Sequence, residues 1–162
     1  MTADVQYYGD GARDGEAEVT RSYWVMASLL LVWGLGYGLL IIEAFFVLRH
    51  EDFDRMVRAG MILPGYEDYV QHLPEWIVAL TVFKGVTRIL GALFLLLRRS
   101  WAVSMYAFSL AASCLIFFRG FFASNRADVE ATAQIGLDVM FFVLAVYALY
   151  FAVAARFRGT LR

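Results

Sequence analysis

Five charged side chains interrupt the apolar stretches of this sequence, and their types allow them to do chemistry. Glu43, Lys84, Arg88, Arg119 and Asp138 each stand within a long apolar run. A charge near the centre of a bilayer costs about 2.5–3.5 kcal/mol on insertion scales, so each needs a partner or a polar cavity. Intramembrane carboxylates and cations of this kind form ion pairs, relay protons or bind charged ligands. Which of these roles is possible depends on the helices that carry the charged side chains.

The apolar runs are long enough to cross a membrane as helices. Each has 22 to 26 residues, and about 20 helical residues span a hydrocarbon core of ~30 Å. Strands are excluded, because an open sheet leaves backbone groups unpaired in lipid and a closed barrel needs about eight strands or more. The four runs are Tyr23–Leu48, Trp76–Leu97, Trp101–Phe122 and Ala131–Ala155. The sequence therefore predicts an all-α membrane protein, an up-down-up-down bundle of four transmembrane helices.

Composition and domain organisation agree with this prediction. The chain has 162 residues, of which 61% are hydrophobic and 18% charged, against about 45–50% and about 25% in soluble domains. A net charge of -1 gives no reason to expect nucleic acid as a partner. Residues 1–21 are polar and lack apolar periodicity, which predicts a disordered tail. Residues 22–156 then form the four-helix transmembrane domain, and residues 157–162 a second tail.

The loop between the first two runs, residues 49–75, has a pattern of its own. Apolar residues recur at helical spacing on both sides of the Pro64-Gly65 turn. They are Phe53, Met56, Val57 and Met61 before the turn, and Tyr66, Tyr69, Val70 and Leu73 after it. Each segment is predicted to be a short amphipathic helix that lies on the outer leaflet or caps the bundle.

The distribution of Lys and Arg predicts the orientation in the membrane. Seven arginines fall on the side of the termini and four on the side of the long loop. The seven are Arg13, Arg21, Arg98, Arg99, Arg156, Arg158 and Arg162, and the four are Arg49, Arg55, Arg58 and Arg126. The positive-inside rule then places both termini in the cytoplasm and the long loop outside.

Antiparallel threading brings the intramembrane charges to one level. At ~1.5 Å per residue, Glu43, Lys84, Arg119 and Asp138 fall in one layer, roughly 5–12 Å below the outer boundary. Arg88 lies one turn deeper on the same helix face as Lys84. Two interpretations stay open. The charges lock the bundle register as ion pairs, or their surplus positive charge receives an anionic ligand, a lipid headgroup or a partner carboxylate. Asp138 is predicted to meet Lys84, with Arg119 as the competing partner.

Several enzyme classes lack their residues. The two histidines, His50 and His72, lie in the long loop, so no pair within the bundle could ligate a haem. The chain has no His/Cys/carboxylate cluster at metal spacing, no P-loop and no Gly-x-Ser-x-Gly. We therefore expect a non-catalytic protein with no metal and no cofactor.

One resemblance enters at the second and third runs. Pro74-x-Trp76, then the stretch from Leu90 to Val103, LGALFLLLRRSWAV, and Ser109-Leu110 resemble a group of small bacterial four-helix membrane proteins. These proteins are uncharacterised, and some carry the label "sugar transporter". The resemblance covers about half the chain and implies the same fold. Lys84 and Arg88 depart from the pattern of the group, so no functional residue is carried over.

The predicted function follows from the charged layer. We expect a multi-pass protein of the cytoplasmic (inner) membrane of a bacterium, acting as an accessory subunit or as a module that binds a small ligand or lipid. The expected partners are the lipid bilayer, a larger membrane complex or further copies of the chain, and an anionic ligand or lipid headgroup. The alternative is a small transporter or channel protomer, which would have to act as a homo-oligomer.

Overall fold

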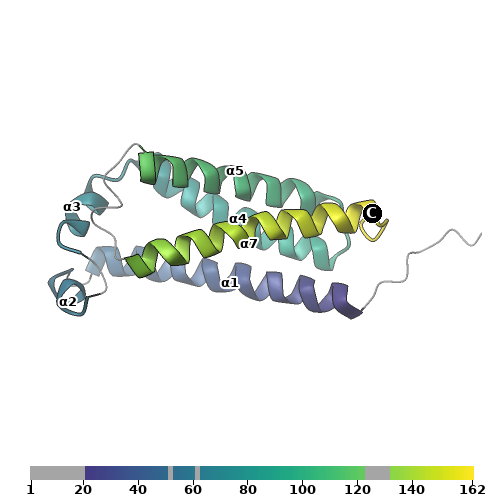
Figure 1. The fold of residues 1–162 in the computed structure, drawn as a ribbon, viewed down its shortest axis with the longest axis horizontal. Coiled ribbons are helices and arrows are strands. Elements are labelled where there is room, and N and C mark those ends of the chain that lie inside the picture. Colours follow the sequence, from purple (N-terminus) through teal and green to yellow (C-terminus); the bar gives the residue numbers. More distant parts are fainter. Residues whose placement is uncertain (1–20, 51–52, 61–62, 123–131) are drawn as a thin grey trace, which may run out of the picture.

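The computed structural model describes residues 21–50, 53–60, 63–122 and 132–162, and within these ranges the chain is helical with no strand (Figure 1). The helices are α1 (Arg21–His50), α2 (Phe53–Arg58), α3 (Tyr66–Gln71), α4 (Glu75–Leu96), α5 (Trp101–Phe122) and α7 (Thr132–Phe157). Residues 1–20 of the predicted tail, together with Met61 and Arg126, lie outside the described residues.

Four of these helices are long and apolar enough to cross a membrane, as the sequence predicts. The spans are Arg21–Ile42, Glu75–Leu96, Trp101–Gly120 and Ile135–Phe157. Large apolar side chains cover their outer surfaces; Val32 and Leu39 are each 67% exposed, which suits lipid rather than water. Trp24, Trp76 and Trp101 are exposed near helix ends, the level at which indoles prefer the membrane interface. The protein is an all-α, multi-pass integral membrane protein, and the predicted fold is confirmed.

The four long helices do not pack equally closely. α4 packs against α1 and α5, and α5 packs against α7. α1 and α7 approach each other less closely, and aromatic side chains bridge them. Tyr23 stacks on Phe151 with ring centroids 5.7 Å apart, and Tyr37 meets Phe141 edge to face at 5.6 Å. Aromatic rings rather than close backbone contact therefore join α1 to α7.

Small residues bring α4 close to its two neighbours. A Cβ added at Gly34 of α1 would lie 3.6 Å from the Ile89 Cα of α4, and one at Gly91 of α4 would lie 3.1 Å from the Tyr106 ring of α5. Small residues at such positions permit close helix approach within a membrane. Gly34 therefore serves packing inside the bundle, and it brings the α1 backbone next to the side chain of Arg88, whose Cγ would lie 3.7 Å from the added Cβ.

The end of the bundle that holds the C-terminus is closed by backbone hydrogen bonds. α4 ends in a Schellman motif, in which the Arg99 N–H donates to Phe94 O (2.8 Å) and the Arg98 N–H to Leu95 O (2.9 Å). Arg98 takes the left-handed position of that motif with φ 55°. The chain after α7 packs onto the same turn, because the Arg162 N–H donates to Arg98 O and the Ser100 N–H donates to Arg162 O, both at 2.7 Å.

The long loop between α1 and α4 holds α2 and α3 at the opposite end of the bundle (Figure 1). Both are six-residue helices, as the apolar spacing on either side of the Pro64-Gly65 turn predicts. Tyr66 and Tyr69 of α3 are half-buried, and their ring centroids lie 6.3 Å apart. α3 thus presents a pair of aromatic rings to the interior at this end of the bundle.

Candidate functional site

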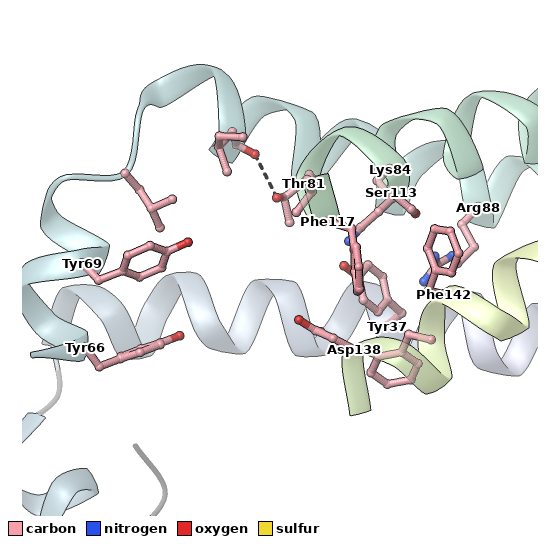
Figure 2. A pocket seen from close by; sticks show the side chains of 14 residues that line it. Tyr37, Tyr66, Tyr69, Thr81, Lys84, Arg88, Ser113, Phe117, Asp138 and Phe142 are labelled. Atoms are coloured by element: carbon pink, nitrogen blue, oxygen red, sulfur yellow. Dashed lines mark hydrogen bonds between the residues drawn. The ribbon is translucent and has the colours of Figure 1, made fainter. Parts of the chain in front are cut away.

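A cavity of about 210 Å³ lies beneath α3, between all four membrane-spanning helices (Figure 2). It is lined by Tyr37 of α1, by Tyr66 and Tyr69 of α3 and the following Leu73, by Ile77, Thr81, Lys84 and Arg88 of α4, by Ser113, Ile116 and Phe117 of α5, and by Asp138, Phe141 and Phe142 of α7. Six of the fourteen lining residues are aromatic, and charged side chains from two different helices point into the cavity. Such a combination of apolar walls with a few convergent polar groups is typical of ligand pockets.

Arg88 forms the deepest charged part of the lining. It lies thirteen residues after Glu75, the first residue of α4, which is about 20 Å along the helix and near the middle of the span. Its side chain is only 2% exposed. The guanidinium carbon lies 4.0 Å from the centroid of the Trp33 ring and 4.3 Å from that of the Tyr37 ring. Two aromatic faces of α1 therefore stabilise this buried cation.

The edge of the same guanidinium lacks hydrogen-bond acceptors. The Nε and Nη1 atoms of Arg88 are buried and have no hydrogen-bond partner within the described part of the chain. An unsatisfied buried donor costs about 1–3 kcal/mol, and more if it is charged. Contact with ring faces does not replace these bonds, because a guanidinium donates in its own plane. Arg88 thus offers in-plane N–H groups to an acceptor that the described residues do not supply.

Lys84 stands one helical turn from Arg88 on the same face of α4. Its Nζ lies 4.8 Å from the centroid of the Tyr37 ring, so one tyrosine of α1 contacts both cations. The backbone near Lys84 is held by two hydroxyl groups, since its carbonyl oxygen accepts from Ser109 Oγ (3.3 Å) and Thr87 Oγ1 (3.1 Å). The Ser109 bond ties α5 to α4 at the depth of the cavity, whereas the Thr87 bond lies within α4.

Asp138 comes from α7 and lines the same cavity as the two cations of α4 (Figure 2). Its side chain is half-buried. Near it, Phe141 reaches Tyr37 and Phe142 reaches Phe117, with ring centroids 5.6 Å apart in both pairs. These two contacts join α7 to α1 and to α5 within one helical turn of Asp138.

Three of the five predicted site residues meet in this cavity. Lys84, Arg88 and Asp138 line it together. Arg119 is half-buried in α5 and does not belong to the lining. Glu43 belongs to α1, but its side chain lies outside the described residues. The contact between Asp138 and Lys84 stays a prediction.

The aromatic partners of the two cations were not predicted from the sequence. Trp33 and Tyr37 stand four residues apart in α1, and Arg88 contacts both rings. Residues at this spacing share one helix face, so a signal was present in the sequence. It could not be assigned to Arg88, because the rotation of α1 relative to α4 is not visible in the spacing. Tyr66 and Tyr69 were placed on a short helix, but not in a cavity.

Beyond Arg88 the interior of the bundle is packed. Ala92 and Leu95 of α4, Tyr106 of α5 and Ala148 of α7 are almost fully buried in a single core cluster. A separate cavity of about 390 Å³ lies between α1 and α7, nearer the C-terminal end of the bundle. Its lining includes Tyr23, Phe151 and Arg158. The cavity under α3 therefore ends near Arg88 within the part of the chain that the structure describes.

The site can hold a small molecule by charge and by ring contacts, with Arg88 and Lys84 as donors and Asp138 as an acceptor. No protein family, curated protein or solved structure matches this chain, so the inference about its function rests on the geometry of this site.

Proposed function

We propose that this protein is a non-catalytic binding module of the membrane that takes up a small anion in the cavity beneath α3, with Arg88 as the receptor for the anion. One observation carries the proposal. A guanidinium that is 2% exposed near the middle of a membrane span has two buried nitrogens, Nε and Nη1, without acceptors in the described chain. An anion that accepts from these atoms removes the cost of the unsatisfied donors and neutralises the buried charge.

Electrostatics favours an anion over a neutral ligand. Among the described lining residues, Lys84 and Arg88 bring two positive charges and Asp138 brings one negative charge. Charges inside a membrane are stabilised by opposite charges or by water-filled cavities. An anion bound at Arg88 would neutralise a guanidinium that is buried near the middle of a membrane span, whereas a neutral ligand would leave that charge in place.

Binding suits the geometry better than passage through the membrane. A transporter or channel protomer needs a polar route to the far side, and beyond Arg88 the interior is filled by buried residues such as Ala92, Leu95 and Tyr106. We therefore favour an accessory or binding role over transport. The positive-inside rule places the α3 end outside the cytoplasmic membrane of a bacterium, so the anion would enter from the outer side.

Trp33 offers a direct test of the proposal, because its ring contacts Arg88. The other tryptophans, Trp24, Trp76 and Trp101, are exposed near helix ends and can be replaced by Phe. Acetate, butyrate and inorganic phosphate are then titrated against the protein in lipid nanodiscs while the emission of Trp33 is recorded. We expect saturable binding of at least one of these anions.

The matched pair of variants is Arg88→Gln and Arg119→Gln. Each removes one arginine from a membrane-spanning helix, but only the first belongs to the cavity. Truncating one partner of a buried charge pair costs about 2–5 kcal/mol of binding free energy. Arg88→Gln should therefore lower the affinity for the anion by more than 30-fold, whereas Arg119→Gln should change that affinity by less than about threefold. Equal binding by the two variants would refute the proposal.

A further inference from the structure

The cavity between α1 and α7 lies at the end of the bundle opposite α3, where α1 begins and where the C-terminus lies (Figure 1). Three parts of the chain form its lining. They are Ser22, Tyr23 and Met26 of α1, Tyr147, Tyr150, Phe151, Ala154 and Ala155 of α7, and Arg158 and Thr160 of the segment that follows α7. The lining thus joins hydroxyl groups and one cation at the helix ends to apolar side chains within the spans.

The segment that follows α7 is held in place by hydrogen bonds on both sides of Arg158. α7 ends in a Schellman motif, in which the Thr160 N–H donates to Ala155 O at 3.0 Å and Gly159 takes the left-handed position with φ 70°. The Thr160 carbonyl oxygen in turn accepts from Arg98 Nε at 3.0 Å. The wall that carries Arg158 is therefore a fixed part of the fold.

Positive side chains are concentrated at this end of the bundle. The arginines here are Arg21, Arg98, Arg99, Arg156, Arg158 and Arg162. Within the described helices, every Asp and Glu belongs to the half of the bundle toward α3, as do Glu75 at the start of α4 and Asp138 near the start of α7. Of these arginines, only Arg158 lines the cavity. Basic pockets between membrane helices are typical binding sites for the headgroups of anionic lipids.

The cavity extends from the helix ends into the apolar part of the spans. Arg158 follows Phe157, the last residue of α7, and Tyr147 lies eleven residues before Arg158, which is about 16 Å along a helix. Met26 and Phe151 line the part between them. The volume of about 390 Å³ is more than twice the ~150 Å³ of a cavity that holds benzene. A free phosphate ion would leave the apolar part unused, whereas the first carbons of an acyl chain would occupy it.

The cavity also reaches the surface of the bundle that faces lipid. Tyr147 and Tyr150 of the lining are 40% and 67% exposed, and amphipathic rings of this kind favour the membrane interface. α1 and α7 approach each other less closely than the other neighbouring helices, with Tyr23 stacked on Phe151 between them. A lipid can therefore enter sideways between α1 and α7 without crossing the packed core.

We propose that this cavity binds one anionic phospholipid, with its phosphate at Arg158 and the beginning of one acyl chain along Met26 and Phe151. A guanidinium donates to phosphate oxygens through charge-assisted hydrogen bonds. The surrounding arginines favour a lipid with net negative charge over a zwitterionic one. The proposal is independent of anion binding beneath α3, because the two cavities share no lining residue.

The test is native mass spectrometry of the full chain in a mild nonionic detergent. The protein is titrated with phosphatidylglycerol and, separately, with phosphatidylcholine that has the same acyl chains. The detergent removes the charged surface of the membrane, so the affinity reports a site rather than the attraction of all the arginines to a lipid surface. We expect one phosphatidylglycerol to bind at least about fivefold more tightly than phosphatidylcholine.

Two matched pairs of variants locate the site. Arg158→Gln should lower the affinity for phosphatidylglycerol at least about tenfold, whereas Arg156→Gln should change it by less than about threefold, because Arg156 is exposed and absent from the lining. Arg158 is itself exposed, so its replacement should leave the unfolding midpoint unchanged. Ala154→Leu fills the cavity and should weaken binding at least about threefold, whereas Val146→Leu, on the exposed side of α7, should not.

Four results would overturn the proposal. Equal affinities for the two lipids, or no binding of either, would show that the cavity does not select an anionic lipid. Equal losses in Arg156→Gln and Arg158→Gln would show that surface charge acts without a site. Full affinity in Ala154→Leu would place the lipid outside the cavity. Displacement of phosphatidylglycerol by an equal concentration of inorganic phosphate would identify a free phosphate as the ligand. None of these results bears on anion binding at Arg88.

Discussion

Replacing Arg88 by methionine should leave the stability of the unliganded protein unchanged or raise it, although the side chain is buried. In the described structure, Nε and Nη1 lack acceptors, and two unsatisfied donors cost together about 2–6 kcal/mol. The cation–π contacts with the Trp33 and Tyr37 rings stabilise the folded state by about 0.5–2 kcal/mol each, or about 1–4 kcal/mol together. The cost exceeds the gain by about 1–2 kcal/mol at the middle of these ranges, and methionine fills a similar volume without buried charge. Such a result would agree with the proposed role of Arg88 in binding rather than in folding.

The assay is equilibrium unfolding of the purified protein in mixed micelles as the fraction of denaturing detergent is raised. Wild type and Arg88→Met are compared without added anion and then with whichever of acetate, butyrate and inorganic phosphate binds wild type most tightly. Without the anion, we expect the stability of Arg88→Met to equal that of wild type or to exceed it by about 1–2 kcal/mol. When the anion is added, only wild type should gain stability. Arg88→Lys is the matched variant, because it keeps the charge and loses the planar guanidinium with its Nε and Nη1 donors.

One result would refute this reasoning. If Arg88→Met loses about 3–5 kcal/mol, Arg88 is one member of a paired, structural charge network whose other member has been left buried and alone. Its unpartnered nitrogens would then not report a ligand, and the proposed function would lose its support.

Three further predictions follow from other contacts. Tyr23→Phe should destabilise the bundle by about 1 kcal/mol in the same unfolding assay, because the Tyr23 hydroxyl donates to a buried α4 carbonyl at 2.6 Å; an unchanged midpoint would contradict this. Lys84 and Asp138 line one cavity, so each single change, Lys84→Asp or Asp138→Lys, should lower expression and the double change should restore it. Expression of the double variant no higher than that of the single variants would show that the two side chains do not meet. An impermeant thiol reagent should label Asp68→Cys in intact cells, in a Cys114→Ser background, and labelling only after lysis would reverse the predicted orientation.

The spans could be predicted from the sequence almost to the residue, because the thickness of the hydrocarbon core sets the length of any helix that crosses it. The second run was predicted as Trp76–Leu97, and α4 extends over Glu75–Leu96. The third run coincides with α5. Interface tryptophans and the residues that end helices are local signals, so they are readable without knowledge of the neighbouring helices.

The candidate site was predictable only in part. Counting residues from the helix ends placed Lys84 and Asp138 at a similar depth, and both line the cavity. The same count placed Arg119 in that layer, yet Arg119 is not part of the lining. Depth follows from the helical rise, which is the same for every sequence. The direction in which a side chain points around the helix axis does not follow from the helical rise, because it depends on how the helix is rotated against its neighbours.

The sequence by itself determined that the chain crosses a membrane four times and that charges stand within those crossings, because a bilayer acts on each helix separately through length and hydropathy. The tertiary structure decided which side chains share a cavity. Gly34 lets α1 approach the stem of Arg88, Gly91 admits the Tyr106 ring, and rings rather than close backbone contact join α1 to α7. These contacts set the rotation of each helix and the order of its neighbours. Rotation and order depend on the fit between two surfaces, and no single run of residues contains both surfaces.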